Sequence, residues 1–177
     1  MLDDSELVRR ASDGDDQAFN AIYERHVGAI RGYVVGRIGP DAADDVVSEV
    51  FLVAWRAAER FDPSATSARP WLYGIATNVM AKHRELEARW IAQHRAESQA
   101  TGRSTGELTA YHLDPELVRA IGTLSPSHRD VLLLTALGEL PVADVARALG
   151  IRQSTARVRL LRARRHVRGV LGGDHDD

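Results

Sequence analysis

The sequence predicts an all-α protein of two small helical domains joined by a flexible linker, with a helix-turn-helix as the second domain. Apolar residues recur at steps of three and four along most of the 177-residue chain, which is the period of one helix face. Aromatic residues make up only 6%, which argues against a β-rich sandwich. Cysteine is absent, so disulfide scaffolds, thiolate zinc sites and cysteine nucleophiles are excluded.

The first long helix is expected over residues 15–38, capped by Asp15. Gly39 and Pro40 break it. Asp41 is then placed to cap a second helix, with Asp44 three residues later as in an acidic capping box. The predicted apolar stripe of the first helix is Phe19, Tyr23, Val27, Ile30 and Val34.

The second helix covers 41–56. Leu52 and Trp55 widen its apolar stripe toward a second surface, which indicates two neighbouring elements. The stripe itself consists of Val47, Val50, Phe51, Ala54 and Ala58.

Residues 61–70 are polar, small and bounded by prolines, so we expect a loop there. Pro70 suits the first position of a third long helix that reaches about Trp90. Together these helices make an N-terminal domain of residues 1–95. The stripe of the third helix is Leu72, Ile75, Ala76, Val79, His83 and Leu86.

Residues 96–114 lose the helical period and are rich in Ser, Thr, Gly and Gln, as expected of a linker. The second domain covers 115–171 and is followed by an acidic tail at 172–177. It starts with a short helix to Ile121 and a helix at 127–137.

A compact helix pair completes the second domain. Pro141 marks the start of one helix, Gly150 its end, and a new helix starts near Ser154. Two helices joined by about four residues at a glycine predict a helix-turn-helix. In the last helix, the face expected to pack is Ala156, Leu160, Ala163 and Val167, and the opposite arc carries Arg157, Val158, Leu161, Arg162 and Arg165. A small apolar stripe with a basic exposed arc is typical of a helix that lies in the DNA major groove.

The formal net charge of −2 hides a gradient along the chain. Residues 1–62 carry 13 acidic and 7 basic groups, whereas residues 147–168 carry eight arginines and no acidic residue. Such asymmetry predicts two partners with surfaces of opposite charge.

Catalytic patterns are missing. There is no glycine-rich phosphate loop, HExxH pair or GxSxG elbow, and the seven histidines lack metal-ligand spacing. Ser127, His128 and Asp130 would spread around a helix start instead of converging as a triad. We therefore expect no enzymatic activity, cofactor or metal.

No apolar run approaches the roughly 20 residues that a bilayer span needs. The acidic N-terminal start also lacks the apolar core of a signal peptide. We expect a cytoplasmic protein that does not itself insert into the membrane.

Four stretches resemble the sigma-70 family of bacterial RNA polymerase initiation factors, specifically the extracytoplasmic-function (ECF) group. They are DQAFNAIYERHVGAIRGYV at 16–34, DAADDVVSEVFLVAWR at 41–56, RPWLYGIATNV at 69–79, and LSPSHRDVLLL with PVADVARALGIRQSTARVRLLRARR at 124–165. The resemblance covers about residues 5–95 and 114–171. It implies a factor that binds core RNA polymerase, recognises the −10 and −35 promoter elements and promotes transcription initiation.

The resemblance also implies roles for three segments. The helix at 41–56 would dock on the clamp helices of the polymerase largest subunit through Asp45, Ser48, Glu49, Leu52 and Trp55, although Trp55 could equally be a core residue. Loop 61–70 and the helix after it would open and read the −10 element, with Asn78, Lys82 and Arg84 along the separated strand and Trp71 and Tyr73 as stacking groups or core residues.

The helix from Ser154 would read the −35 element as duplex DNA. Its base-facing positions are Arg157, Val158, Leu161 and Arg162, with Arg152, Ser154, Thr155 and Arg165 near phosphates. Arginine can bind guanine through two hydrogen bonds. Where the family commonly has Gly-Thr-Val-Lys-Ser-Arg-Leu-His, this chain has Ser-Thr-Ala-Arg-Val-Arg-Leu-Leu, and Val158 and Leu161 favour contacts with thymine methyl groups.

An anti-sigma factor is a common partner in this group. The linker is either a simple tether or, as the family implies, a segment that threads toward the active-centre and RNA-exit channels. Two alternative functions stay open: a stand-alone helix-turn-helix regulator with an N-terminal dimerisation or ligand domain, and a protein-binding adaptor. The acidic and aromatic helix at 41–56 distinguishes them, because a stand-alone regulator has no need of a polymerase-facing surface.

Overall fold

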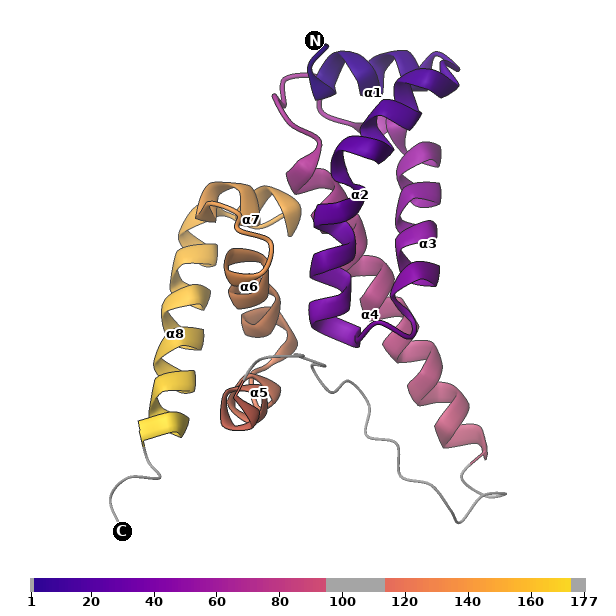
Figure 1. The fold of residues 1–177 in the computed structure, drawn as a ribbon. Coiled ribbons are helices and arrows are strands. Elements are labelled where there is room, and N and C mark those ends of the chain that lie inside the picture. Colours follow the sequence, from indigo (N-terminus) through magenta and orange to yellow (C-terminus); the bar gives the residue numbers. More distant parts are fainter. Residues whose placement is uncertain (1, 95–113, 173–177) are drawn as a thin grey trace.

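The computed structural model describes residues 2–94 and 114–172, and every regular element in these ranges is a helix (Figure 1). The predicted all-α class is confirmed, whereas the predicted linker and acidic tail lie almost entirely outside the described residues. Among the described residues no helix is long and apolar enough to cross a membrane. The elements are α1 (Asp4–Ser12), α2 (Asp16–Ile38), α3 (Ala43–Arg56), a 3-10 turn (Ala58–Arg60), α4 (Arg69–His94), α5 (Pro115–Gly122), α6 (Pro126–Ala136), α7 (Val142–Ala148) and α8 (Gln153–Gly172).

Helix α2 is the centre of the N-terminal unit, with α1, α3 and α4 packed on it. Asp15 caps it as predicted, its carboxylate accepting hydrogen bonds from the N–H groups of Gln17 and Ala18. The buried face differs from the predicted stripe, since Tyr23 is exposed and two polar residues are inside. That face consists of Ala18, Ile22, His26, Ile30, Tyr33, Val34 and Arg37. His26 and Arg37 are polar, so the apolar pattern of the sequence did not include them. They can be buried because partners on other helices satisfy their polar atoms.

The N-cap of α3 is not the predicted Asp41. Its N-cap is Ala42, which makes no side-chain hydrogen bond. Asp44 instead pairs with Arg31 of α2, at 2.8 Å from carboxylate to Nε. The predicted stripe of α3 is buried throughout, so the packing of this helix was predicted correctly even though its cap was not.

Helix α4 begins at Arg69, one residue before the predicted start, because the hydroxyl of Ser67 accepts a hydrogen bond from the Arg69 N–H at 3.2 Å. His83 and Leu86, predicted to belong to the core stripe, are exposed. His83 lies at the surface beside Glu49 of α3, and the last turns of α4 extend past the ends of α2 and α3 (Figure 1).

Helices α5 to α8 form the C-terminal unit, in which α8 packs on the other three. Helix α7 follows Pro141, and Gly150 after it takes a φ of +61°, the left-handed conformation common after helix ends. The four predicted packing residues of α8 are all buried. The helix-turn-helix is therefore confirmed as α7 and α8.

The two units pack against each other through α4 and α7. At Gly74, a Cβ atom would lie 2.4 Å from the carbonyl oxygen of Ala148, so only glycine permits this approach of the two helices. Arg69 also donates a hydrogen bond from Nη2 to the Gly138 carbonyl at 2.9 Å.

A buried polar cluster lies in the same interface. Arg37 of α2 forms an ion pair with Asp130 of α6, at 2.7 Å from Nη2 to Oδ1. Its Nη1 donates to the Tyr33 hydroxyl at 2.8 Å, and that hydroxyl is 3.0 Å from the hydroxyl of Thr77 on α4. Burial lowers the pKa of Arg37, but the neighbouring Tyr33 and Asp130 outweigh it and raise the pKa above its ordinary value. The guanidinium thus stays charged at a position where its side chain is only 3% exposed.

Candidate DNA and polymerase interfaces

The outer surface of helix α8 carries arginine and apolar side chains and no acidic residue. Arg157, Arg162 and Arg165 are exposed, and within the described residues they form no ion pair. Val158 and Leu161 lie among them, 46% and 48% exposed. The apolar pair and the guanidinium groups therefore share one arc, which offers methyl contacts beside hydrogen-bond donors, the two kinds of contact that base edges accept.

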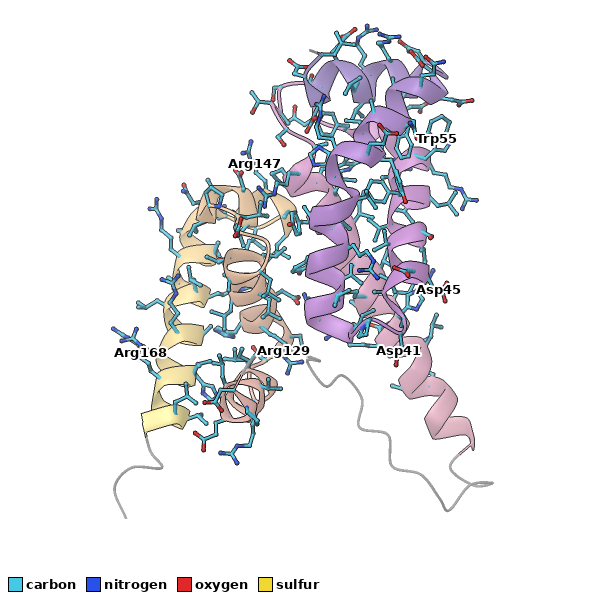
Figure 2. All side chains as sticks on the ribbon, in the orientation of Figure 1. Asp41, Asp45, Trp55, Arg129, Arg147 and Arg168 are labelled. Carbon is cyan, nitrogen blue, oxygen red and sulfur yellow. The ribbon has the colours of Figure 1, made fainter. Side chains whose placement is uncertain are left out.

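The start of α8 adds polar groups to this arc. Arg152 and Ser154 are exposed and Thr155 is half-buried. Seven of the eight residues that the sequence assigned to this surface lie on α8, and Arg152 directly precedes the helix. Arg164 and Arg168 are exposed on the same helix but were not selected from the sequence. Figure 2 shows Arg168 pointing away from the N-terminal unit.

Helix α3 carries the second surface. Asp45, Ser48, Glu49, Leu52 and Trp55 are spaced so that they share one face of a helix. Asp45, Ser48 and Leu52 are exposed, while Glu49 and Trp55 are half-buried. In Figure 2, Asp45 and Trp55 lie on the side of the N-terminal unit that faces away from α8.

Two of these side chains have partners inside the chain. Glu49 of α3 lies 2.5 Å from His83 Nε2 and 3.8 Å from Lys82 Nζ, both on α4. Trp55 packs edge-on against Phe19, with ring centroids 4.9 Å apart. Trp55 is therefore packed against Phe19 and also partly exposed, so both alternatives that the sequence offered for it stay open.

The five residues proposed for the −10 element divide between two faces of α4. At 100° per residue, Trp71, Asn78 and Lys82 lie on one face, while Tyr73 and Arg84 lie on another. Asn78 and Lys82 are exposed, and Trp71 is half-buried against Phe61 at 5.2 Å between ring centroids.

Tyr73 and Arg84 face the C-terminal unit. Tyr73 is 1% exposed and packed edge-on against Tyr33, so in this arrangement it is a core residue and is not placed to stack on a base. Burial, with Arg37 nearby, lowers the pKa of the half-buried Arg84. Sequence reasoning missed that this face of α4 holds the second unit, because the partner residues lie at least 45 positions away.

The loop before α4 is folded on itself. Asp62 Oδ1 accepts hydrogen bonds from the Ser64 N–H and hydroxyl, at 2.9 and 2.7 Å. Phe61 is buried, whereas Pro63, Ser64 and Thr66 are exposed. The loop therefore presents its middle to solvent while its start is anchored in the core.

Comparisons with known proteins identify both units. Residues 22–89 match the family described as Sigma-70 region 2, and residues 115–167 match Sigma-70, region 4. The ECF RNA polymerase sigma factor SigL of Mycobacterium tuberculosis is 30% identical over 167 residues, covering 93% of this chain and 94% of SigL. RNA polymerase sigma factor NccH of Alcaligenes xylosoxydans xylosoxydans is 28% identical over 177 residues, covering 95% of this chain and 94% of NccH.

Solved structures agree with this assignment. CnrH, in complex with the cytosolic domain of CnrY, superposes with a TM-score of 0.67 at 27% identity, covering 97% of this chain and 98% of CnrH. Sigma factor RpoE of Bartonella quintana, solved with the anti-sigma factor NepR, has the same fold, with a TM-score of 0.66 at 21% identity over 90% of this chain and 98% of RpoE.

A region 2 unit followed by a region 4 helix-turn-helix defines a transcription initiation factor of the sigma-70 class. Within that class, the chain belongs to the ECF RNA polymerase sigma factors. As a sigma factor it binds core RNA polymerase and promoter DNA, and the alternative of a stand-alone regulator is not favoured.

Proposed function

We propose that this ECF sigma factor docks on core polymerase through the exposed face of α3, reads the −10 element with loop 61–70 and the outer face of α4, and reads the −35 element with α8. The observation that carries the proposal is the placement of two faces of opposite charge on opposite sides of the molecule (Figure 2). A factor that bridges polymerase and DNA needs both faces free at once.

At the −35 element, Arg157, Val158, Leu161 and Arg162 contact base edges in the proposed mode. Arg152, Ser154, Thr155 and Arg165 contact phosphates, which fix position and register without specifying sequence. Within the part of the chain that the structure describes, these arginines form no ion pair, which supports these roles because no such pair has to break before DNA binds.

At the −10 element, Asn78, Lys82 and Trp71 line the proposed path of the separated strand. Cationic groups next to an aromatic ring are the common means of binding single-stranded DNA. Tyr73 and Arg84 are left out of this surface because they face the C-terminal unit.

The factor contributes recruitment, recognition and strand opening in this proposal, while all catalysis belongs to the polymerase. Its place of action is the cytoplasm, where the polymerase works. An anti-sigma protein is a proposed further partner, since CnrH was solved with the cytosolic domain of CnrY and RpoE with the anti-sigma factor NepR.

Run-off transcription with purified core polymerase and a library of random promoters tests the proposal. The expected result is enrichment of templates with two elements, and little binding of promoter DNA by the factor without polymerase. Tight, sequence-specific binding of a dimer to DNA without polymerase would contradict the proposal.

A further inference from the structure

Asp4 is a buried carboxylate that joins three parts of the N-terminal unit. It is the first residue of α1 and is 4% exposed. From α2, Arg25 Nη1 lies 2.5 Å from its Oδ1 and His26 Nε2 lies 2.8 Å from its Oδ2. Oδ2 also accepts hydrogen bonds from the loop before α4, from the Ala68 N–H at 2.8 Å and the Ser67 hydroxyl at 3.2 Å.

The bonds to Ser67 and Ala68 fix the place where the loop becomes α4. The Ala68 carbonyl accepts the first helical hydrogen bond, from the Leu72 N–H at 2.9 Å. The Ser67 hydroxyl that donates to Asp4 also accepts from the Arg69 N–H. The carboxylate therefore positions the first turn of α4 as well as the end of the loop.

The neighbouring residue holds the other end of the loop. The Ser5 hydroxyl donates to the Pro63 carbonyl at 3.0 Å. Two adjacent residues of α1 thus fix both ends of the segment 63–68, and its middle residues Ser64 and Thr66 stay exposed. A loop held at both ends loses less conformational entropy when it binds a ligand.

The carboxylate is held in its charged form. Burial raises the pKa of Asp4, but the Ala68 N–H, Arg25 and His26 together outweigh burial and leave the pKa below its ordinary value. A charged acceptor makes stronger hydrogen bonds than a neutral one, so the loop is tied by the carboxylate form of this side chain.

We propose that Asp4 is a positioning residue for promoter reading: it sets the orientation in which loop 61–70 and the start of α4 meet the −10 strand. This inference rests on the proposed assignment of that loop to the −10 element. Asp4 touches no DNA in this mechanism and acts through Ser67 and Ala68.

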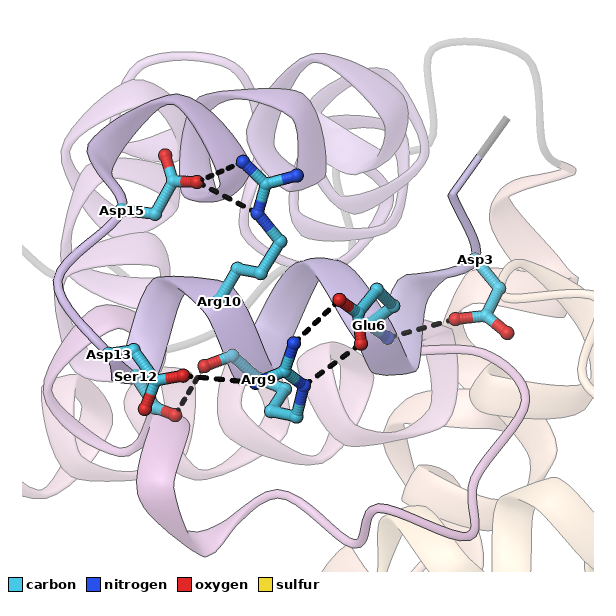
Figure 3. A network of polar contacts seen from close by, with 7 residues as sticks. All are labelled: Asp3, Glu6, Arg9, Arg10, Ser12, Asp13 and Asp15. Carbon is cyan, nitrogen blue, oxygen red and sulfur yellow. Dashed lines mark hydrogen bonds and ion pairs between the residues drawn. The ribbon is translucent and has the colours of Figure 1, made fainter.

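The surface contacts of α1 supply a matched control. Asp3 caps α1 by accepting from the Glu6 N–H at 2.8 Å, and Arg9 pairs with Glu6 and Asp13 along the same helix (Figure 3). Asp3→Ala therefore removes a cap from α1 but breaks no bond to the loop, whereas Asp4→Ala removes both loop bonds.

The experiment compares full-length variants with purified core polymerase on templates whose −10 region is already mismatched and open. Single base changes in that region measure discrimination, while binding to core polymerase and thermal unfolding measure the fold. Asp4→Ala is expected to reduce discrimination about tenfold, the scale of one lost base contact, with core binding retained. Asp3→Ala should keep discrimination at the wild-type level.

Two outcomes would overturn the inference. Equal loss of discrimination in Asp3→Ala and Asp4→Ala would show that only the stability of α1 matters. Wild-type discrimination between −10 bases by a folded Asp4→Ala protein would show that the hydrogen bonds from Ser67 and Ala68 to Asp4 are not needed. If Asp4→Ala does not fold, Asp4→Asn provides the comparison, because it keeps the size of the side chain and removes the charge that strengthens its hydrogen bonds to Ser67 and Ala68. Absence of −10 discrimination in the wild type is a different result, which would reject the assignment of the loop itself.

Discussion

Helices α3 and α8 are built alike and use their charges differently. Each has one apolar face in the core and one charged face toward solvent. On α3, Glu49 pairs with α4 and Asp44 with α2. On α8, Arg157, Arg162 and Arg165 have no ion pair within the described ranges. The acidic residues of α3 thus serve partly to hold the fold, while the arginines of α8 are available to an outside partner.

One of the contacts that hold the two units in this arrangement is the Arg37–Asp130 pair. Asp130→Ala would leave the Arg37 charge buried without its partner, which costs about 3–5 kcal/mol. We expect the free energy of unfolding to fall by that amount, measured by urea denaturation. Replacing both residues together, as Arg37→Met with Asp130→Leu, should recover most of the loss because no buried charge remains. Little change in Asp130→Ala would mean that the pair does not hold the units together.

The proposed reading of the −35 element by α8 can be tested at Arg162. Arg162→Ala should reduce transcription from promoters with a −35 element about 5- to 150-fold, corresponding to about 1–3 kcal/mol per bidentate base contact. Run-off transcription with and without that element measures the effect. Arg164→Ala is the comparison, because this exposed arginine lies on the same helix but is not one of the eight proposed contact residues. An equal loss on promoters that lack the element would argue against base reading.

The proposed docking of α3 on polymerase can be tested at Asp45. Unlike Glu49, Asp45 has no ion pair among the described residues. Asp45→Lys should weaken binding to core polymerase about two- to tenfold, because exposed charge contacts contribute about 0.2–1 kcal/mol each and reversal also adds repulsion. Adding Glu49→Lys should weaken it further. Co-purification with core polymerase gives the readout. Asp41→Lys, an exposed change outside the proposed set (Figure 2), should leave binding unchanged, and equal weakening by both changes would reject the docking face.

The smallest effect concerns acid stability. The folded-state pKa of Asp4 lies below its ordinary value of 3.8, so its charged form stabilises the fold above about pH 4. That contribution should disappear as the pH falls through the lowered pKa. Urea unfolding of wild type and Asp4→Asn between pH 6 and 3 should show a stability difference that shrinks toward low pH. A constant difference would mean that the charge of Asp4 does not contribute.

Most of the fold could be predicted because helix period, prolines and glycines act locally. The buried stripes of α3 and α8 were found correctly for this reason. The buried face of α2 was not predicted correctly. Arg37 is expected at the surface from the sequence, because its burial depends on Asp130, which lies 93 positions later in the chain. Asp4 escaped notice for the same reason: its loop partners are more than 60 positions away. The arginines of α8 have no ion pair within the described ranges, so their exposure could be predicted from the helix period alone.

Gly74 determines how closely the two DNA-reading units can sit. In the proposed function the promoter sets the distance between the two elements, and with it the distance at which α4 and α8 must sit on the DNA. Here α7 lies between α4 and α8, which at packing distances of 8–10 Å puts the two helices only about 20 Å apart. A promoter that spaces its elements more widely than this is engaged at both elements only by molecules whose units have separated, so on that promoter the apparent dissociation constant equals the intrinsic one divided by the separated fraction. Gly74→Ala, which places a methyl group against the Ala148 carbonyl, would increase that fraction and make the same promoter respond to less factor, without changing a residue that touches DNA.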